Sequence, residues 1–231
     1  MKEEHQDNSL WLRMWQNEQT DEFHQTQVNS MLTRFWHGLH LKKNSRVLVP
    51  LCGKSRDMLW LAEQGCHVIG VELSPVAVKA FFQENQLKVK KKRLGNFTLW
   101  QSGVISIWCG DYFSLRSLQL GRIDCVFDRA SLTALPAEIR SRYVDQLRAL
   151  MSADALIFLL TVEDIAINSN LSKYHIDAEL YELYREYFHI ELTHVQRCSS
   201  LNTSACGDDY HRDQKVYRIE QHTLPHPVAG Y

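Results

Sequence analysis

The stretch VLVPLCGKSRDMLWLAEQGCHVIGVELS, from Val47 to Ser74, decides the fold of this chain. It begins with an apolar strand, passes through a turn and an amphipathic helix, and ends in a second apolar strand closed by an acid. Such a βαβ unit is the nucleotide-binding half of a doubly wound α/β sheet. Dinucleotide sites place several glycines in the first turn, whereas this turn has only Gly53. The turn is therefore either a damaged phosphate site or a site built for another ligand.

Strand and helix patterns alternate outward from this unit and predict one doubly wound, mostly parallel sheet. Apolar runs predict the strands, and apolar residues three or four apart predict the helices. The expected strands are 46–51, 67–72, 104–109, 122–128 and 155–161, and the expected helices are 28–41, 55–64, 75–86, 136–151 and 177–187. Ser55 and Ser74 are the expected N-caps of two of these helices.

Two further patterns complete the sheet. Ser102 and Gly103 separate two alternating runs, which predicts a hairpin before the third main strand. Residues 189–197 and 215–220 also alternate and predict an antiparallel pair at the end of the sheet. No internal repeat or linker interrupts the pattern. We therefore expect a single domain over residues 1–231, with residues 1–41 as an N-terminal lid and helix and residues 42–231 as the core.

Composition narrows the class of function. The chain has 231 residues and a formal net charge of -1, which gives no field for nucleic acid or membrane surfaces. Its apolar runs are too short to span a bilayer, and residues 1–9 lack the apolar region of a secretion signal. Six cysteines are present without a C-x-x-C pair, which favours reduced thiols in a cytoplasmic protein and no metal site.

The strand ends carry the candidate chemistry. Because ligands of open parallel sheets bind outside the carboxyl ends of the strands, we expect residues 51–53, 72, 110–111 and 128–129 to line one crevice. Glu72 follows Leu51 by about 20 residues, the offset of an acid that accepts hydrogen bonds from ribose hydroxyls. S-adenosyl-L-methionine has a ribose but no phosphate, so one glycine for close backbone approach is enough. The missing glycines thus disfavour NAD.

Two other strand ends allow a structural and a functional interpretation each. Asp111 is placed to meet an adenine amino group, with Tyr112 or Phe113 packed on the ring, or else it caps a turn. Arg129 ends an apolar strand, and its charge needs a partner there. That partner is either a nearby carboxylate in a local ion pair, or the carboxylate of a cofactor or an anionic substrate.

Several stretches together resemble the thiopurine S-methyltransferase family, most closely its bacterial branch. They are WLRMW (11–15), FHQTQVN (23–29), RVLVPLCGKSRDMLWLAEQG (46–65), VIGVELS (68–74), IWCGDYFSL (107–115), FDRASLTALP (127–136) and VYRIEQ (216–221). They follow one another over nearly the whole chain. The resemblance implies a Rossmann-like class I methyltransferase fold, whose sheets end in an antiparallel strand pair. S-adenosyl-L-methionine would be the cofactor and S-adenosyl-L-homocysteine its product.

The resemblance also implies roles for single residues. Trp15 resembles the tryptophan that covers the cofactor, Leu51 a strand-end contact to it, and Glu72 the ribose-binding acid. Asp111 and Tyr112 fall where the family meets adenine. Arg129 resembles an arginine on the cofactor and substrate side, with a candidate electrostatic role, and Phe23 an aromatic substrate contact. One extra residue between Trp15 and Phe23 departs from the family pattern.

The implied reaction moves a methyl group from the sulfonium to the sulfur of a thiopurine or another aromatic or heterocyclic thiol. A thiol on an electron-poor ring is partly ionised near neutral pH and needs little general-base help, although His24 is a possible proton acceptor. Trp11 and Trp15 lie on one helix face, as a lid over the site or as plain core packing. We expect small-molecule substrates and a monomer.

Three alternatives share part of this pattern. Methylation of selenium or tellurium species, as in metalloid detoxification, would use the same cofactor residues. A nucleic-acid-binding or RNA-modifying module would use the basic run at residues 88–93, but that run lacks interleaved aromatic residues. The basic run has two other interpretations: a solvated surface, or a positive charge that attracts anionic substrates. A protein that binds the cofactor without catalysis is the third.

Overall fold

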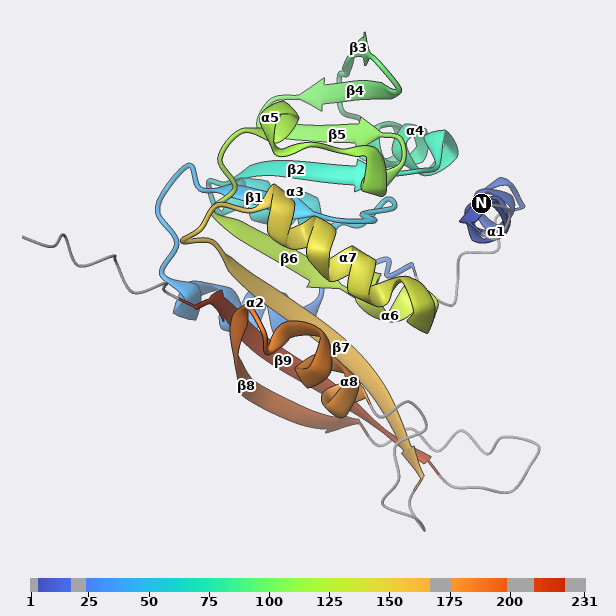
Figure 1. Ribbon diagram of the computed structural model, residues 1–231. Helices are drawn as coiled ribbons and strands as arrows, with labels where there is room; N and C mark the ends of the chain where they lie inside the picture. The colour runs from blue at the N-terminus through green and yellow to red at the C-terminus, as the bar shows by residue number, and fades with distance from the viewer. Residues whose placement is uncertain (1–3, 18–23, 167–175, 199–209, 223–231) are drawn as a thin grey trace, which may run out of the picture.

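A computed structural model describes residues 4–17, 24–166, 176–198 and 210–222. Its centre is a nine-stranded sheet with the strand order β3-β4-β5-β2-β1-β6-β7-β9-β8 (Figure 1). The strands are β1 (Arg46–Val49), β2 (His67–Glu72), β3 (Lys90–Leu94), β4 (Phe97–Ser102), β5 (Ile105–Cys109), β6 (Cys125–Arg129), β7 (Leu156–Ala166), β8 (Phe188–Cys198) and β9 (Tyr210–Gln221). The five central strands, β5, β2, β1, β6 and β7, are parallel, and the outer strands pair antiparallel.

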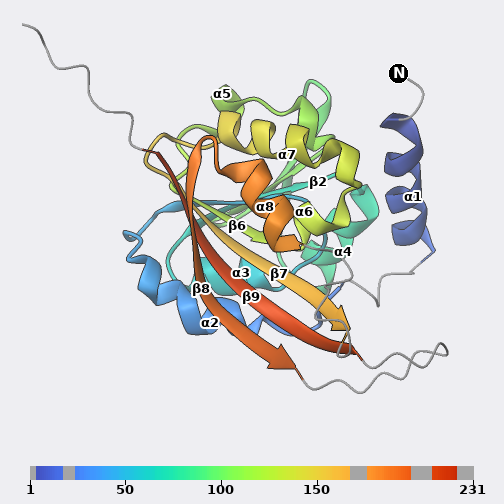
Figure 2. The ribbon, with the colours of Figure 1, turned by 60° about the horizontal axis from the view of Figure 1, so that its bottom comes forward.

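Helices cover both faces of the sheet (Figures 1 and 2). The α-helices are α1 (Glu4–Gln16), α2 (Ser30–Phe35), α3 (Asp57–Glu63), α4 (Pro75–Glu84), α5 (Ser117–Leu120), α6 (Ser131–Ala134), α7 (Ala137–Leu150) and α8 (Ile176–Tyr184), and the 3-10 helices are η1 (Trp36–Leu39) and η2 (Tyr112–Ser114). The chain leaves β1 toward β2 on one side and later returns to β6 on the other. The strand order therefore reverses between β1 and β6, where doubly wound sheets bind ligands.

Alternating side chains divide the core into two layers. Val47 and Val49 of β1 pack with Met58 and Phe81 from the helices α3 and α4. Leu48, between them, faces the other layer, which contains α7 and α8. This alternation is the reason that β1 reads as a continuous apolar run.

The predicted elements are confirmed in type, with three corrections. The segment 28–41 is not one helix, because it divides into α2 and η1. The helix α3 begins at Asp57 rather than Ser55, although the Ser55 hydroxyl accepts a hydrogen bond from the Asp57 amide at 3.2 Å. Ser74 does cap α4, since its hydroxyl accepts from the Ala77 amide.

The third correction concerns the basic run, which forms most of β3. Lys90 to Arg93 are exposed and pair antiparallel with β4. The ammonium group of Lys91 lies 3.5 Å from the centre of the Trp100 ring. The run carries no apolar alternation because β3 is an edge strand that packs little, and its charges discourage the addition of another strand.

The N-terminal helix α1 lies beside α4 at the end of the molecule where the central strands terminate (Figures 1 and 2). None of the described helices has both the length and the apolar character needed to cross a membrane. Four cysteines, Cys52, Cys66, Cys109 and Cys125, are free thiols. Within the described ranges, no three His, Cys, Asp or Glu side chains form a group that could hold a metal ion.

Candidate active site

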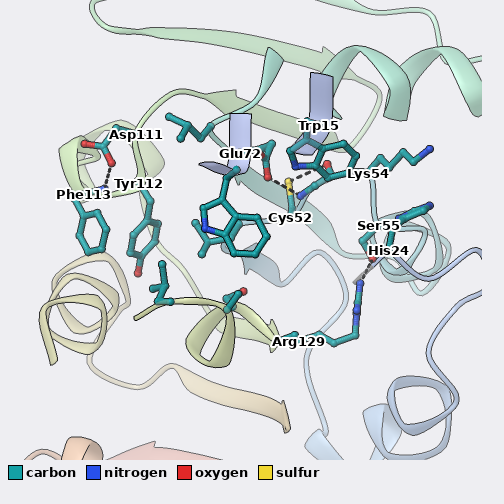
Figure 3. Close-up of a pocket in the computed structure, with 18 residues that line it drawn as sticks. Trp15, His24, Cys52, Lys54, Ser55, Glu72, Asp111, Tyr112, Phe113 and Arg129 are labelled. Atoms are coloured by element: carbon teal, nitrogen blue, oxygen red, sulfur yellow. Dashed lines mark hydrogen bonds between the residues drawn. The ribbon is translucent and has the colours of Figure 1, made fainter. Parts of the chain in front are cut away.

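A pocket opens at the carboxyl ends of β1, β2 and β6, at the reversal of strand order. It contains about 930 Å³ of empty space, which is continuous with solvent. Seven of the predicted site residues line it: Trp15, Leu51, Gly53, Glu72, Asp111, Tyr112 and Arg129. Figure 3 shows their order, with Asp111 and Tyr112 at one end, Arg129 at the other, and Glu72 and Trp15 between them. The described structure therefore brings these residues together.

The turn after β1 has a left-handed backbone at two positions. Leu51 has φ of 44° and Gly53 has φ of 52°. Leu51 packs against the core layer that contains α7. A Cβ atom on Gly53 would lie only 3.0 Å from Cζ2 of the Trp15 indole. The glycine thus provides the left-handed turn and also leaves room for Trp15, which is buried at 7% exposure.

Glu72 ties the ends of β1 and β2 together. One carboxylate oxygen accepts a hydrogen bond from the Gly53 amide at 2.8 Å, and the other accepts from the Ser74 amide at 2.7 Å. Burial raises the pKa of the Glu72 carboxyl, and the two amides partly oppose that shift. A carboxylate offers about four lone-pair sites, so the two amides leave acceptor capacity for a ligand in the pocket.

At the far end of the pocket, Asp111 caps the helix η2. Its carboxylate accepts hydrogen bonds from the Phe113 amide at 3.1 Å and from the Ser114 hydroxyl at 2.8 Å. Asp111 therefore does cap a turn, which was one of its two predicted roles. Tyr112 is 2% exposed, and its ring packs on Tyr143. Most of this tyrosine is therefore buried in the core, although the residue also lines the pocket.

Arg129 reaches back toward the turn after β1. Its Nε donates to the carboxylate of Asp57 at 2.9 Å. Its Nη2 donates to the Ser55 hydroxyl at 3.3 Å, as Figure 3 shows. The Arg129 side chain is 15% exposed and the Asp57 side chain 1% exposed. Of the two partners predicted for Arg129, the nearby carboxylate is therefore present, and it belongs to Asp57. A guanidinium has five N–H donors, and the two used here leave others for a ligand.

Asp128 is the strand-end residue that the crevice prediction placed wrongly. Its carboxylate is fully buried beneath the pocket and accepts from the Tyr143 hydroxyl at 2.7 Å and the Ser131 amide at 3.0 Å. Adjacent residues of a strand point to opposite sides, so Asp128 and Arg129 cannot both face one cavity. Gly110 also lies outside the lining, and a Cβ atom there would lie 2.5 Å from Cδ1 of Phe97.

Sequence reasoning missed several residues of the pocket, among them Ser131 and Lys54. Ser131 donates from its hydroxyl to the Pro50 carbonyl at 2.8 Å and thereby ties the end of β6 to the end of β1. Ala130, between the end of β6 and the start of α6, has a left-handed φ of 65°. Lys54 lines the pocket and forms an ion pair with Glu84 of α4 at 2.8 Å. The signal for Lys54 and Ser131 was their position, one residue after Gly53 and two residues after Arg129.

Two N-terminal predictions differ in outcome. His24 lines the pocket at the same end as Arg129. Phe23, the predicted substrate contact, lies outside the described residues, as does most of the segment with the extra residue. The helix face with Trp11 and Trp15 does turn toward the pocket, where both indoles line it.

The sequence matches a known protein family over most of its length. A sequence model of the family described as Thiopurine S-methyltransferase (TPMT) matches residues 6–222. The chain belongs to the thiopurine S-methyltransferase family. A thiopurine S-methyltransferase of Stutzerimonas stutzeri (strain A1501) is 54% identical over 191 residues, which are 82% of this chain and 81% of that protein. One from Pseudomonas syringae pv. tomato is 47% identical over 154 residues, 67% of this chain and 70% of that protein.

Solved structures confirm the fold expected of a thiopurine S-methyltransferase family member. A SAM-dependent methyltransferase from Anabaena variabilis has a TM-score of 0.62 at 17% identity, covering 93% of this chain and 94% of that one. The magnesium protoporphyrin IX methyltransferase from Synechocystis PCC 6803, solved with bound SAM, has a TM-score of 0.59 at 16% identity, covering 93% and 97%. The predicted Rossmann-like class I methyltransferase fold is thus confirmed, and the family's residue roles stay predictions.

Proposed function

We propose that this protein transfers a methyl group from S-adenosyl-L-methionine to the sulfur of a thiopurine or a similar aromatic or heterocyclic thiol. One observation carries the proposal. Among the described residues that line the pocket, Glu72 is the one buried carboxylate, fixed between the turns after β1 and β2, and Trp15 packs over Gly53 of the first turn. This arrangement suits a nucleoside without phosphates.

The lining supports a particular order of contacts for the cofactor. Asp111 and Tyr112, at one end, suit adenine, because the Asp111 carboxylate accepts two hydrogen bonds in its turn and keeps acceptor capacity for an amino group. Glu72, in the middle, suits the ribose hydroxyls. Trp15 and Gly53 suit the methionine part, whose cationic sulfur is attracted by the aromatic face and by the nearby carboxylate. The arrangement of Figure 3 follows this order.

When bound, S-adenosyl-L-methionine supplies an electrophilic methyl group on a sulfonium. The protein's own residues hold the reacting groups in line and exclude water. Alignment of this kind lowers the activation barrier by up to about 7–11 kcal/mol. The Arg129 guanidinium, at the far end of the pocket from Asp111, favours an anionic thiolate by its charge. Asp57 compensates part of that charge, so Arg129 orients the nucleophile more than it attracts it over distance.

Proton removal needs little help from the chain in this proposal. His24 is the one histidine among the residues that line the described pocket, and it lies at the Arg129 end. Burial raises the pKa of Cys52 well above its usual value, so this thiol stays protonated and is a poor nucleophile. The pocket therefore suits a substrate that brings its own ionised sulfur, as thiopurines do.

A substrate panel with labelled S-adenosyl-L-methionine tests the proposal. We expect methyl transfer to 6-mercaptopurine and thiophenol, and impaired transfer to 6-mercaptopurine in Arg129→Ala. Selenite and tellurite form the second arm of the panel, because chalcogen methylation would use the same cofactor contacts. Turnover of selenite or tellurite alone would replace the thiol with a chalcogen substrate, and no turnover of any acceptor would refute the proposal.

A binding experiment tests the cofactor site by itself. S-adenosyl-L-homocysteine at about 100 times its Kd adds about 2.7 kcal/mol to the free energy of unfolding, which raises the Tm of a chain of this size by about 5–11 °C. Glu72→Ala should remove most of that rise, whereas Glu138→Ala, at an exposed position of α7, should retain it. An unchanged rise in Glu72→Ala would remove Glu72 from the site.

The remaining features of the proposal concern setting and assembly. We infer a cytoplasmic protein from its free thiols, since such thiols persist in a reducing compartment. We also infer a monomer that acts on small molecules without nucleic acid or membrane. Light scattering at several concentrations tests the monomer, and an RNA-binding titration at low salt tests the exposed basic strand β3.

A further inference from the structure

Asp57 is a buried carboxylate directly behind the pocket, and none of the roles predicted above includes it. It is the first residue of α3 and is 1% exposed. It does not line the pocket, although its contacts Ser55 and Arg129 both do. A buried carboxylate is costly unless it is paired and hydrogen-bonded, so its surroundings must account for it.

The Asp57 carboxylate joins three segments that are far apart in the sequence. Its Oδ1 accepts a hydrogen bond from the Asn29 amide at 2.8 Å. Its Oδ2 accepts from the Ser55 hydroxyl at 3.0 Å and from Nε of Arg129 at 2.9 Å. These segments are the N-terminal region that follows His24, the turn after β1, and the end of β6. The last two segments border the pocket, and the first follows directly after His24, which lines it.

The contacts at Oδ2 fix the plane of the Arg129 guanidinium. Nε of Arg129 meets Asp57, and Nη2 meets Ser55, whose hydroxyl in turn donates to the same Asp57 oxygen. A planar group held at two points through a rigid fork has little freedom to rotate. The remaining guanidinium N–H groups therefore have a set direction relative to the pocket.

The contact at Oδ1 anchors the N-terminal region to the same carboxylate. Asn29 is the N-cap of α2, and its side chain accepts from the amides of Met31 and Leu32. The backbone amide of Asn29 itself has no acceptor within the helix α2, as is usual at a helix N-terminus. The Asp57 carboxylate accepts its hydrogen bond instead. His24, which lines the pocket, lies five residues before this anchor.

We propose that Asp57 is a positioning residue, which orients Arg129 toward the methyl acceptor and holds the N-terminal region in register with it. Asp57 itself touches neither reacting group, and its effect on turnover passes through Arg129. This inference rests on the proposed methyl transfer, in which Arg129 faces the acceptor.

Two variants of Asp57 separate its links. Asp57→Asn keeps an oxygen for the Asn29 amide but presents an NH2 group to Arg129 and Ser55, so it breaks the contacts at Oδ2 and keeps the contact at Oδ1. Asp57→Ala breaks both. Asp124→Asn is the matched control, because the Asp124 carboxylate also accepts from one backbone amide, that of Arg46 at 2.8 Å, and from one arginine Nε, that of Arg122 at 2.6 Å. Asp124 precedes β6, at the opposite end of the sheet from the pocket.

Steady-state kinetics with 6-mercaptopurine should show the effect on the acceptor. We expect kcat/KM to fall about 10- to 100-fold in Asp57→Asn, as for a reacting group misplaced by about 1 Å, and to change less than about twofold in the control. In an Arg129→Gln background, Asp57→Asn should cost little more, because residues that act through one another are not additive. An equal cost in both backgrounds would overturn the proposal.

Two measurements do not depend on turnover. The NMR signal of the Arg129 Nε–H, assigned by its loss in Arg129→Gln, should shift and exchange faster with water in Asp57→Asn than in the wild type. Hydrogen exchange of the Asn29 amide should stay slow in Asp57→Asn and become fast in Asp57→Ala. Should Asp57→Asn fail to fold, Ser55→Ala replaces it for the Arg129 signal, with a smaller change in the same direction.

These arms distinguish the two proposals. A wild-type protein that methylates no acceptor in the panel would refute the proposed function, and the NMR and exchange results would still decide the role of Asp57. An active wild type with an unchanged Arg129 signal in Asp57→Asn would refute the positioning role alone.

Discussion

The packing of Trp15 on Gly53 makes Gly53→Ala the sharpest test of the cofactor site. Gly53 has φ of 52°, and a left-handed backbone costs an L-residue about 1–2 kcal/mol. The new Cβ would also lie 3.0 Å from Cζ2 and 3.4 Å from Cη2 of Trp15. Because the first distance is shorter than an ordinary van der Waals contact, the indole must shift. The substitution therefore strains the backbone and also displaces the Trp15 indole that covers the turn.

Gly103 provides a matched control for the strain. It has φ of 56°, in the hairpin between β4 and β5, and a Cβ there would meet no atom within 4 Å. Gly103→Ala should therefore lower the free energy of unfolding by the same 1–2 kcal/mol, roughly, without moving any side chain. For a chain of this size, that loss corresponds to a fall in Tm of about 2–8 °C.

Affinity for S-adenosyl-L-homocysteine separates the two variants. A displaced aromatic contact is worth about 0.5–1.5 kcal/mol, which weakens binding by roughly two- to tenfold in Gly53→Ala. Gly103→Ala should bind like the wild type. Isothermal titration calorimetry gives the affinities and urea unfolding gives the stabilities. Equal affinity in all three proteins would mean that Trp15 does not cover the bound ligand, and our interpretation of the lid would be wrong.

Three further predictions concern the frame of the pocket, and urea unfolding measures each. Ser131→Ala removes the hydrogen bond to the Pro50 carbonyl and should cost about 1–3 kcal/mol; a loss below about 0.5 kcal/mol, typical of surface sites, would contradict this. Gly70→Ala places a Cβ 2.7 Å from Sγ of Cys52 and should cost about 1–3 kcal/mol, part of which Cys52→Ala in the same chain should restore. Burial raises the pKa of the Asp128 carboxyl, so the folded protein keeps a proton that the unfolded chain releases above about pH 4. The free energy of unfolding of the wild type therefore falls as the pH rises from about 4 through the raised pKa of folded Asp128. Asp128→Asn lacks this loss, so its free energy of unfolding should increase relative to that of the wild type over the same pH range. Parallel pH profiles of the two proteins would show that Asp128 does not titrate in this way.

The sequence by itself determined the sheet and the class of ligand. Apolar periodicity is a local property, and the strands β1 and β2 with the helix α3 between them follow from it to within two residues. The offset from Leu51 to Glu72 and the single glycine of the first turn are also local. They were sufficient to favour a nucleoside without phosphates, and family membership agrees with that prediction.

Only the tertiary structure decided where the charged side chains point. Arg129 and Asp57 are distant in sequence, and the strand order places β6 beside β1 so that their ion pair can form. The Asp111 carboxylate caps the helix η2, and the Asp128 carboxylate is buried in the core. The orientation of a polar side chain depends on which donors and acceptors the folded sheet brings within about 3 Å. The pattern of one segment does not contain that information.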